Sequence, residues 1–343
     1  MTHTLFPRLA LAICFWILSG LGNTAFSGPA GSGENREAQQ KLAITARYNV
    51  PIAELSGLAM VRSIREAGEE ANPAAGTGTI NLYAVGDASY DVVRLRIDSS
   101  SGDVSMRVDD VASVLGRHAG NASQWEAIAT DSLDTVCMLS ETRSEISCLD
   151  LSLKKDQGTF KLDVSGIKHL DRVWQDQPNS RGEGMILMKN GHALILKEKQ
   201  PSMLIEFGPE GDSPMGYGPD TFLQHGEAFA VLRSKHWIAL KTWEFSDRLG
   251  ELARDASEIT LGPDGRVYLL SQESSMLIRL EKTLKADEEK ITVDHDMYWK
   301  LPAGIKKAEG LVIDDQMRPW IGIDIKQKDR SNLFLLSPIE AGN

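Results

Sequence analysis

The chain contains five copies of one pattern, and each copy has three short apolar segments separated by turn residues. In the first copy these segments are residues 54–59, 81–87 and 92–97, and the other copies begin at residues 125, 182, 257 and 308. A unit of several short strands that recurs along a chain is typical of a β-propeller. The repeat therefore predicts an all-β propeller as the fold.

We predict six blades, because the roughly 300 residues that follow the N-terminal segment allow about 50 for each blade. The sixth blade is expected between the third and fourth copies, with residues 227–232 and 237–241 as two of its strands. The last copy reaches only its third strand, and residues 42–50 read as a strand that precedes the first copy. Pairing that strand into the last blade would close the ring and leave no open sheet edge.

The N-terminal segment has the features of a secretory signal peptide. Arg8 precedes an apolar run of residues 9–21, which is shorter than the ~20 residues of a membrane span, and Ala25-Phe-Ser27 matches a signal-peptidase site. We expect a signal peptide at 1–27, a flexible linker at 28–40 and a single propeller domain at 41–343. The protein is then exported, to the periplasm or beyond. The alternative is an uncleaved N-terminal anchor.

The composition narrows the set of partners. The chain has 343 residues and a net charge of −11, with 42% hydrophobic and 25% charged residues, as in ordinary globular domains. An acidic surface repels phosphate, which argues against nucleic acid as a partner. We expect a monomer with no membrane span after signal cleavage, whose partner is a small molecule or a protein of the cell envelope.

Two cysteines are left once Cys14 departs with the signal peptide. Cys137 and Cys148 lie on consecutive predicted strands, and they face each other if the turn is centred on Thr142 and Arg143. An oxidising compartment favours a disulfide between them. The alternative is a pair of buried thiols that act as small hydrophobic side chains.

Known catalytic motifs are missing from the sequence. It has no Gly-x-Ser-x-Gly elbow, no His-Glu-x-x-His, no P-loop and no dinucleotide fingerprint. The histidines show no metal-ligand spacing, and we expect surface or turn positions for all of them. Apart from His3 in the N-terminal segment, they are His118, His169, His192, His225, His236 and His295.

Two columns of oxygen-bearing residues recur through the copies. In a propeller blade the start of the first strand and the end of the second open on the same face, so these columns should meet at one mouth of the central channel. The first column is Ser56, Glu126, Glu183, Glu258 and Glu309, with Glu227 as a further candidate. The second column is Asp87, Glu141, Glu198, Gln272 and Asp324.

Carboxylates gathered in one mouth repel each other, at about 4 kcal/mol for a pair ~4 Å apart at an effective dielectric constant of 20. Intervening water, partial protonation, pairing with Lys197, Arg181 or Lys241, or a bridging cation would relieve this repulsion. Among cations, Ca²⁺ suits a site whose ligands are all oxygen atoms. We expect a Ca²⁺ site built from some of Glu126, Glu183, Glu258, Glu309, Asp87 and Asp324. The alternative is that these acids cap strands and fasten neighbouring blades together.

Several short phrases resemble a known family. Ser56-Gly-Leu-Ala, Arg181-Gly-Glu-Gly-Met, Lys197-Glu-Lys and Ala308-Glu-Gly-Leu are similar to recurrent phrases of the SdiA-regulated propeller family. They also resemble the related domain described as the esterase-like activity of phytase. The resemblance extends over about residues 42–338, and it implies an exported six-bladed propeller with a calcium site. Ser257-Glu-Ile departs from the Ser-Gly-Leu of the family.

Two functions agree with these observations. One is a propeller of the cell envelope that binds a divalent cation or a small ligand at its acidic mouth. The other is a calcium-dependent hydrolase of phosphoesters, esters or lactones, in which the cation polarises the substrate and a free carboxylate acts as general base. Because no catalytic residue can be singled out beside the acids, the sequence favours the binding function.

We predict that the mature chain begins near Gly28. Mass spectrometry of the protein recovered from its native compartment should give a mass that lacks residues 1–27, because signal peptidase cleaves after Ser27. A chain that retains Met1 to Ser27 would contradict the cleavage.

Overall fold

The computed structural model describes residues 41–62, 78–199, 201–224, 226–232, 236–292 and 297–339. These residues belong to one compact unit, Gln39–Asn343. The predicted signal peptide and linker, residues 1–40, lie outside the described residues, as do His225 and His295. Within the described ranges, no helix has the length and apolar character that a membrane crossing requires.

Each of the five sequence copies forms an antiparallel unit of four strands. Unit 1 contains β2 (Leu55–Val61), β3 (Thr79–Gly86), β4 (Asp91–Asp98) and β5 (Val104–Asp110), and unit 2 contains β6 (Trp125–Thr130), β7 (Thr135–Ser140), β8 (Glu145–Asp150) and β9 (Asp156–Asp163). Unit 3 contains β10 (Gly184–Leu187), β11 (Ala193–Lys197), β12 (Met203–Pro209) and β13 (Trp237–Phe245), and unit 4 contains β14 (Ala256–Leu261), β15 (Val267–Ser271), β16 (Met276–Leu280) and β18 (Tyr298–Lys300). Unit 5 contains β19 (Ala308–Ile313), β20 (Pro319–Ile323), β21 (Leu333–Leu336) and β1 (Ile44–Tyr48).

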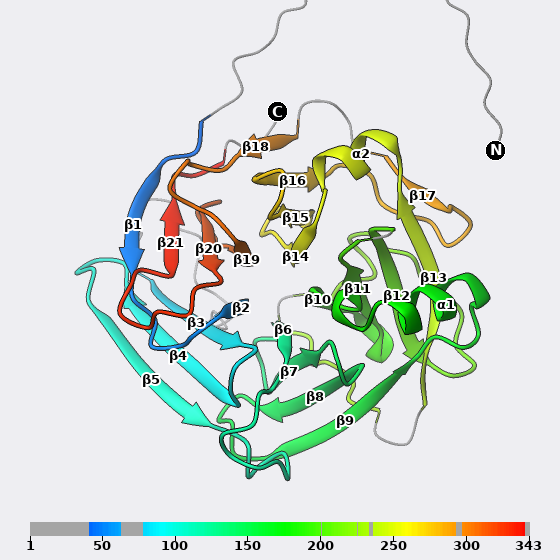
Figure 1. Ribbon diagram of the computed structural model, residues 1–343, viewed down its shortest axis with the longest axis horizontal. Coiled ribbons are helices and arrows are strands. Elements are labelled where there is room, and N and C mark those ends of the chain that lie inside the picture. The colour runs from blue at the N-terminus through cyan, green and yellow to red at the C-terminus, as the bar shows by residue number, and fades with distance from the viewer. Residues whose placement is uncertain are drawn as a thin grey trace, which may run out of the picture. The chain divides into compact units, whose positions relative to one another are not determined.

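The units stand in a ring around their first strands (Figure 1). β2, β6, β10, β14 and β19 each contact the next in this order, and β19 contacts β2. The second strands of units 2 to 5, β7, β11, β15 and β20, are buried along their whole length because they lie between neighbouring units. Such strands read as continuous apolar runs, which is why the repeat is legible in the sequence. The fold is the predicted propeller.

The expected count of six blades is not confirmed. Residues 237–241, expected in a separate blade, belong to β13, which pairs with β12 and completes unit 3. Residues 227–232 form no strand, and Phe229 packs instead in the core against Trp237. Their apolar pattern therefore reflects burial of side chains and not strand pairing. The described residues form five four-stranded units and no separate sixth one.

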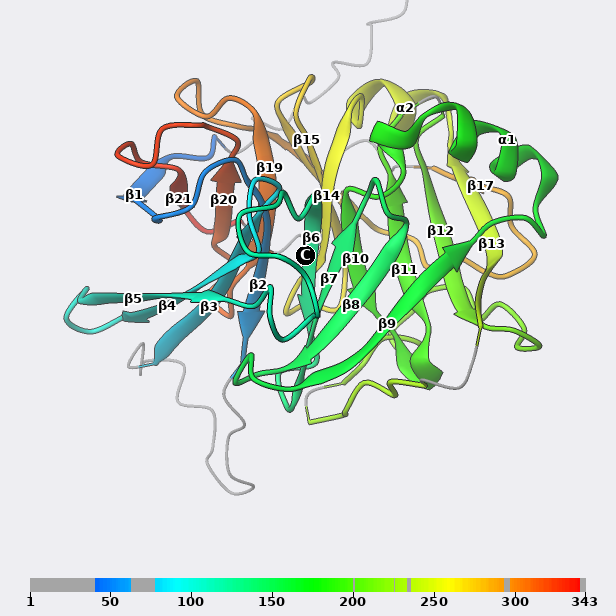
Figure 2. The ribbon, with the colours of Figure 1, turned by 60° about the horizontal axis from the view of Figure 1, so that its bottom comes forward.

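Units 2 and 3 share one sheet. β13 pairs in parallel with β9 at Trp237–Leu162 and Ile238–Asp163, and also with the short β17 (Lys290–Ile291). The result is a nine-stranded sheet, visible on the right of Figure 2 as the adjoining strands β9 and β13. Two short helices, α1 (Lys168–Asp176) and α2 (Asp247–Leu252), and two single 3₁₀ turns, η1 (Pro178–Ser180) and η2 (Lys189–Gly191), lie in the connections of this region.

The N-terminal strand closes the ring, as predicted for residues 42–50. β1 pairs antiparallel with β21, with Tyr48 opposite Leu333. The buried Asn332 reinforces this closure: its Oδ1 accepts a hydrogen bond from the Val50 N–H at 2.8 Å, and its Nδ2 donates to the carbonyls of Val50 and Ile52 at 3.0 and 3.1 Å. One amide side chain thus satisfies three backbone groups beside the closing strand.

The disulfide between Cys137 and Cys148, one of two alternatives in the sequence analysis, is present. Cys137 on β7 lies directly opposite Cys148 on β8, and the two sulfur atoms are bonded. Ser140 pairs with Glu145, so the turn is centred on Thr142 and Arg143 as expected. The two Cα atoms are 4.0 Å apart, and both residues are fully buried in the core between units 2 and 3.

We predict that the closure carries much of the stability of the ring. Asn332→Ala should lower the free energy of unfolding by at least about 2 kcal/mol, because it leaves three buried backbone groups without a partner. Deletion of residues 42–50 should destabilise the fold more strongly, since it exposes the edge of β21. Denaturant unfolding of the variants measures both effects.

The exposed Asn121→Ala is the matched control and should unfold like the parent. A deletion variant as stable as the parent would show that the ring does not depend on β1.

Candidate functional site

The first column of the sequence corresponds to a β-bulge at the start of each inner strand. In units 1, 2, 4 and 5 the register shifts by one residue there, at Ser56, Glu126, Ser257 and Glu309. The residue two positions earlier has a left-handed backbone in each case, with φ between 52° and 55°. Glu183 of unit 3 stands at the same place directly before β10. The local backbone therefore presents one side chain per unit at this end of the channel.

The second column is tied to the same turns. The backbone N–H groups of Asp87, Glu141, Gln272 and Asp324 donate to the carbonyls of the left-handed residues that precede the bulges. These four hydrogen bonds, at 2.9–3.4 Å, bring the end of each second strand beside the start of the first strand. The two columns thus meet at one mouth, as the sequence analysis predicted.

One member of the first column was assigned wrongly. The bulge of unit 4 lies at Ser257, so Glu258 takes the position held by Gly57, Ala127, Gly184 and Gly310 in the other units. Its side chain is 1% exposed and lies against Gly184, where a Cβ would come within 2.7 Å of the Glu258 Oε1 atom. Oε1 accepts from the Ile259 N–H at 2.9 Å, and Oε2 has no hydrogen-bond partner among the described residues.

The carboxyl groups that do converge form what we call the acidic mouth. Its members are Asp87, Glu126, Glu141, Glu183, Glu198, Glu309 and Asp324. Burial, followed by the charges of Glu141 and Asp87, raises the pKa of Glu126 to about 9. Burial and then Asp324 raise the pKa of Glu309 to about 8. Burial also raises the pKa of Glu183, and the neighbouring Glu141 and Glu126 raise it further.

Basic side chains lie at the rim of this mouth. Lys199 Nζ is 2.7 Å from Glu198 and 2.9 Å from Asp255, Lys307 pairs with Asp324, and Lys326 is 3.4 Å from Glu54. The lysine side chains are 43–83% exposed, so water weakens these pairs. Among the described residues, no ion pair reaches the inner carboxyl groups of Asp87, Glu126, Glu183 or Glu309.

Some residues of the two columns also fasten neighbouring units together. Gln272 Nε2 of unit 4 donates to Glu309 Oε1 of unit 5 at 2.7 Å, and the Arg181 N–H before β10 donates to Glu141 Oε1 of unit 2 at 3.2 Å. The serines of the first column do the same, since Ser56 donates to the Trp125 carbonyl and Ser257 to the Ala308 carbonyl. These residues therefore link neighbouring units by hydrogen bonds, as the alternative interpretation of the two columns predicted.

The donor set of the mouth suits a hard cation, because every donor is an oxygen atom. One buried oxygen, Asp87 Oδ1, has no hydrogen-bond partner within the described ranges. Over the same ranges, however, no three His, Cys, Asp or Glu side chains are arranged as a ready metal-coordination group. A cation at this mouth would therefore need water molecules or side-chain movement to complete its coordination.

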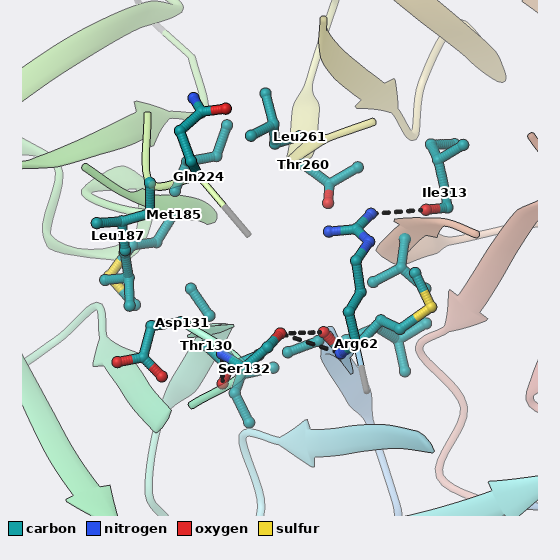
Figure 3. A pocket seen from close by; sticks show the side chains of 18 residues that line it. Arg62, Thr130, Asp131, Ser132, Met185, Leu187, Gln224, Thr260, Leu261 and Ile313 are labelled. Carbon is teal, nitrogen blue, oxygen red and sulfur yellow. Dashed lines mark hydrogen bonds between the residues drawn. The ribbon is translucent and has the colours of Figure 1, made fainter. Parts of the chain in front are cut away.

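Glu227 does not belong to the acidic mouth. It lies in the connection between β12 and β13, where its carboxylate accepts from the Gln224 N–H and its Oε1 is 3.3 Å from Lys189 Nζ. Gln224 lines a cavity at the other end of the inner strands, which the sequence analysis missed. This cavity is formed where the first strands end, and Figure 3 shows Arg62, Asp131, Thr260 and Met185 around it.

Comparison with known proteins settles the family. A model of the SdiA-regulated family matches residues 82–322, well over half of the chain. The chain belongs to the SdiA-regulated family. This confirms the resemblance noted from the short phrases of the sequence. No curated protein sequence matches the chain.

Several solved structures are distantly similar. A streptogramin B lyase has 11% identity and a TM-score of 0.41, with 86% of this chain and 97% of that chain covered. The virginiamycin B lyase from Staphylococcus aureus has 11% identity and a TM-score of 0.41, with 87% and 99% covered. A protein of unknown function from Bacteroides caccae has 9% identity and a TM-score of 0.34, with 70% and 64% covered. At this level of similarity no activity of these proteins carries over.

One histidine of this SdiA-regulated family member is not at the surface. His192 is 1% exposed, with Nδ1 2.7 Å from Glu206 and Nε2 3.3 Å from Asp212. Burial lowers the pKa of His192, but the hydrogen bonds and charges of Glu206 and Asp212 together outweigh burial, and the pKa is raised. Glu206 also accepts from the N–H groups of Met215 and Gly216, so the cluster holds the connection after β12 in place. His118, His169 and His236 are exposed, as expected.

We predict a pH-dependent effect of Glu258→Gln. Burial raises the pKa of Glu258 well above its usual value, so the folded protein keeps a proton that the unfolded chain releases. The wild type therefore loses stability through this group as the pH rises above the usual carboxyl range, and the glutamine variant lacks this one contribution. Between pH 5 and 7, unfolding free energies should shift in favour of the variant by up to about 1.4 kcal/mol per pH unit.

The control is Glu210→Gln at an exposed position, which should follow the wild type at every pH. Parallel stability curves for Glu258→Gln and the wild type would mean that Glu258 stays ionised in the fold.

Proposed function

We propose that this protein is a binding propeller whose acidic mouth takes a positively charged ligand, with Ca²⁺ as the leading candidate. The observation that carries the proposal is the set of four inner carboxyl groups without an ion-pair partner among the described residues. Asp87 and Glu309 raise the pKa of Glu126, Asp87 also raises that of Glu309, and Glu126 raises that of Glu183. These groups come from units 1, 2, 3 and 5, so one ligand would contact four parts of the ring.

The repulsion between the carboxylates of the acidic mouth supports a cation as the bound ligand. Two ionised carboxylates ~4 Å apart repel by about 4 kcal/mol at an effective dielectric constant of 20. Protons relieve that repulsion when no other cation is bound, and a divalent cation relieves it more fully because it carries two charges. The lysines offset this repulsion only in part. Lys307 and Lys326 lower the pKa of Glu309 and of Asp87, but each forms its ion pair with an outer residue, Asp324 or Glu54. Lys197 is buried near Glu183 and Glu141, and burial lowers its own pKa to about 8.

The spread of the carboxyl groups favours a cation that keeps part of its hydration shell. Ca²⁺ accepts six to eight oxygen ligands in flexible geometry, and water can supply several of them. Glu126, Glu183, Glu309, Asp87 and Asp324 would supply protein oxygens in this arrangement. Glu258 is left out of the proposed ligands, because its carboxyl group is enclosed beside Gly184.

The alternative function, a calcium-dependent hydrolase of phosphoesters, esters or lactones, would use the same cation. It would also need a carboxylate free to act as general base. No individual side chain among the described residues is singled out for that role by its contacts. A panel of ester, lactone and phosphoester substrates, assayed with and without Ca²⁺, tests for such activity.

The same proposal places the protein outside the cytoplasm, in the periplasm or secreted. It rests on the predicted signal peptide and on the disulfide of Cys137 and Cys148, which an oxidising compartment favours.

We predict that Ca²⁺ raises the melting temperature of the protein and that EDTA lowers it. At 100 times its dissociation constant, a ligand that binds only the folded state adds about 2.7 kcal/mol of stability. The double variant Glu183→Gln, Glu309→Gln should lose the difference between Ca²⁺ and EDTA, because two central carboxylates are removed. Thermal unfolding and calorimetric titration with Ca²⁺ and Mg²⁺ measure the effect.

The matched control is Glu210→Gln with Glu289→Gln, which changes the net charge equally at two exposed positions. It should respond to Ca²⁺ like the wild type. A wild-type melting temperature that is the same in Ca²⁺ and in EDTA would mean that the mouth only fastens the units together.

A further inference from the structure

A second cavity lies at the opposite end of the inner strands from the acidic mouth. Along β6, Glu126 stands at the start, and Thr130 and Asp131 stand at the end beside the cavity. At about 3.3 Å per strand residue, the two ends are roughly 15 Å apart. We call this space the Arg62 cavity, after the residue of unit 1 that lines one side of it (Figure 3).

The walls of the Arg62 cavity present apolar and polar surface in about equal amounts. Met60, Met185, Leu187 and Leu261 of units 1, 3 and 4 form apolar wall, and the polar side chains include Thr130, Thr260 and Gln224. The cavity has a volume of about 140 Å³. An apolar protein cavity of about this size is known to hold one benzene molecule. The space therefore limits the apolar body of a ligand to about one six-membered ring.

Arg62 is held in position by three contacts. Its Nε is 3.2 Å from Asp315 Oδ1, its Nη2 donates to the Ile313 carbonyl at 3.3 Å, and its backbone N–H donates to Ser132 Oγ at 3.0 Å. Figure 3 shows the other terminal nitrogen of the guanidinium pointing into the cavity. A guanidinium has five N–H donors in a rigid fork, so this edge keeps donors for a ligand.

The one acidic residue among the described lining residues does not compete for that edge. Asp131 Oδ1 accepts from the backbone N–H groups of Leu133, Asp134 and Thr135, and Oδ2 accepts from the Phe229 N–H at 2.9 Å. Both carboxylate oxygens are thus used by the fold. In Figure 3 its carboxylate lies on the far side of the cavity from the guanidinium. The charge that faces the cavity is positive.

We propose that the Arg62 cavity binds a small carboxylate with an apolar body of about the size of a benzene ring. The carboxylate would accept hydrogen bonds from the free edge of Arg62, and the ring would lie between Met185, Leu187 and Leu261. A hydrogen bond between a guanidinium and a carboxylate is roughly twice as strong as one between neutral groups. The chemistry is opposite to that of the acidic mouth, so the two ends of the channel select ligands of opposite charge.

Benzoate is the probe for this site, and isothermal titration together with ligand-observed NMR measures its binding to the full-length mature protein in EDTA. Benzoate should bind at least tenfold more tightly than benzyl alcohol or benzylamine, which have the ring without the carboxylate. Arg62→Met should weaken benzoate binding at least tenfold. Arg107→Met is the matched control, because Arg107 is 65% exposed and pairs with Asp109 on the outer sheet of unit 1.

Thr260→Phe is a second test that leaves the arginine in place. It should abolish benzoate binding because the larger side chain fills the cavity, and circular dichroism and the melting temperature check that each variant is folded. Equal binding of benzoate by the wild type and by Arg62→Met would overturn the proposal. So would benzyl alcohol that binds as well as benzoate, or the lack of saturable benzoate binding to the wild type. None of these results depends on Ca²⁺, which keeps the two sites separable.

Discussion

The pairing of β1 with β21 is the constraint on which the rest of this propeller depends. It joins residues that are 290 positions apart, Thr45 and Leu335, and so fixes the circumference of the ring. Each four-stranded unit buries its faces only when it is pressed against both neighbours, and that condition holds for all five units only in a closed ring. The acidic mouth and the Arg62 cavity exist for the same reason, because the ring gathers the ends of the inner strands at its centre.

The bulge at the start of the inner strands explains why one column contains both residues that link neighbouring units and residues that face the acidic mouth. A serine at this position is short enough to reach only the adjacent carbonyl, as Ser56 and Ser257 do. A glutamate at the equivalent position is longer and extends toward the other carboxyl groups, as Glu126 and Glu309 do. The choice between the two residue types thus decides whether a unit contributes a fastener or a charge to the mouth.

The sequence predicted most of the fold and the acidic mouth because both follow from a regular repeat. Glu126, Glu183, Glu309, Asp87 and Asp324 lie at the strand ends where the repeat indicated, and their role as metal ligands stays a prediction. Glu258 was misplaced because a bulge moves the register by one residue, and Ser257 and Glu258 are both polar, so the pattern does not reveal the shift. The number of blades and the position of Arg62 at a cavity depend on long-range packing, which a local sequence pattern does not contain. Residues 227–232 look like a strand but contribute Phe229 to a core, and Arg62 meets Ile313 only in the folded ring.

The parallel pairing of β9 with β13 makes the ring mechanically uneven. Units 2 and 3 are joined at their outer edges as well as through their inner strands, and the disulfide of Cys137 and Cys148 lies in the core between them. The short β17, in the connection between β16 and β18 of unit 4, extends this seam because it also pairs with β13. Among the described strands, the two junctions of unit 1 and the junction of units 4 and 5 have no outer strand pairing. The width of the channel is therefore held least tightly beside unit 1, which carries Arg62 and Asp87, whereas Glu126 and Glu183 lie on the joined units 2 and 3.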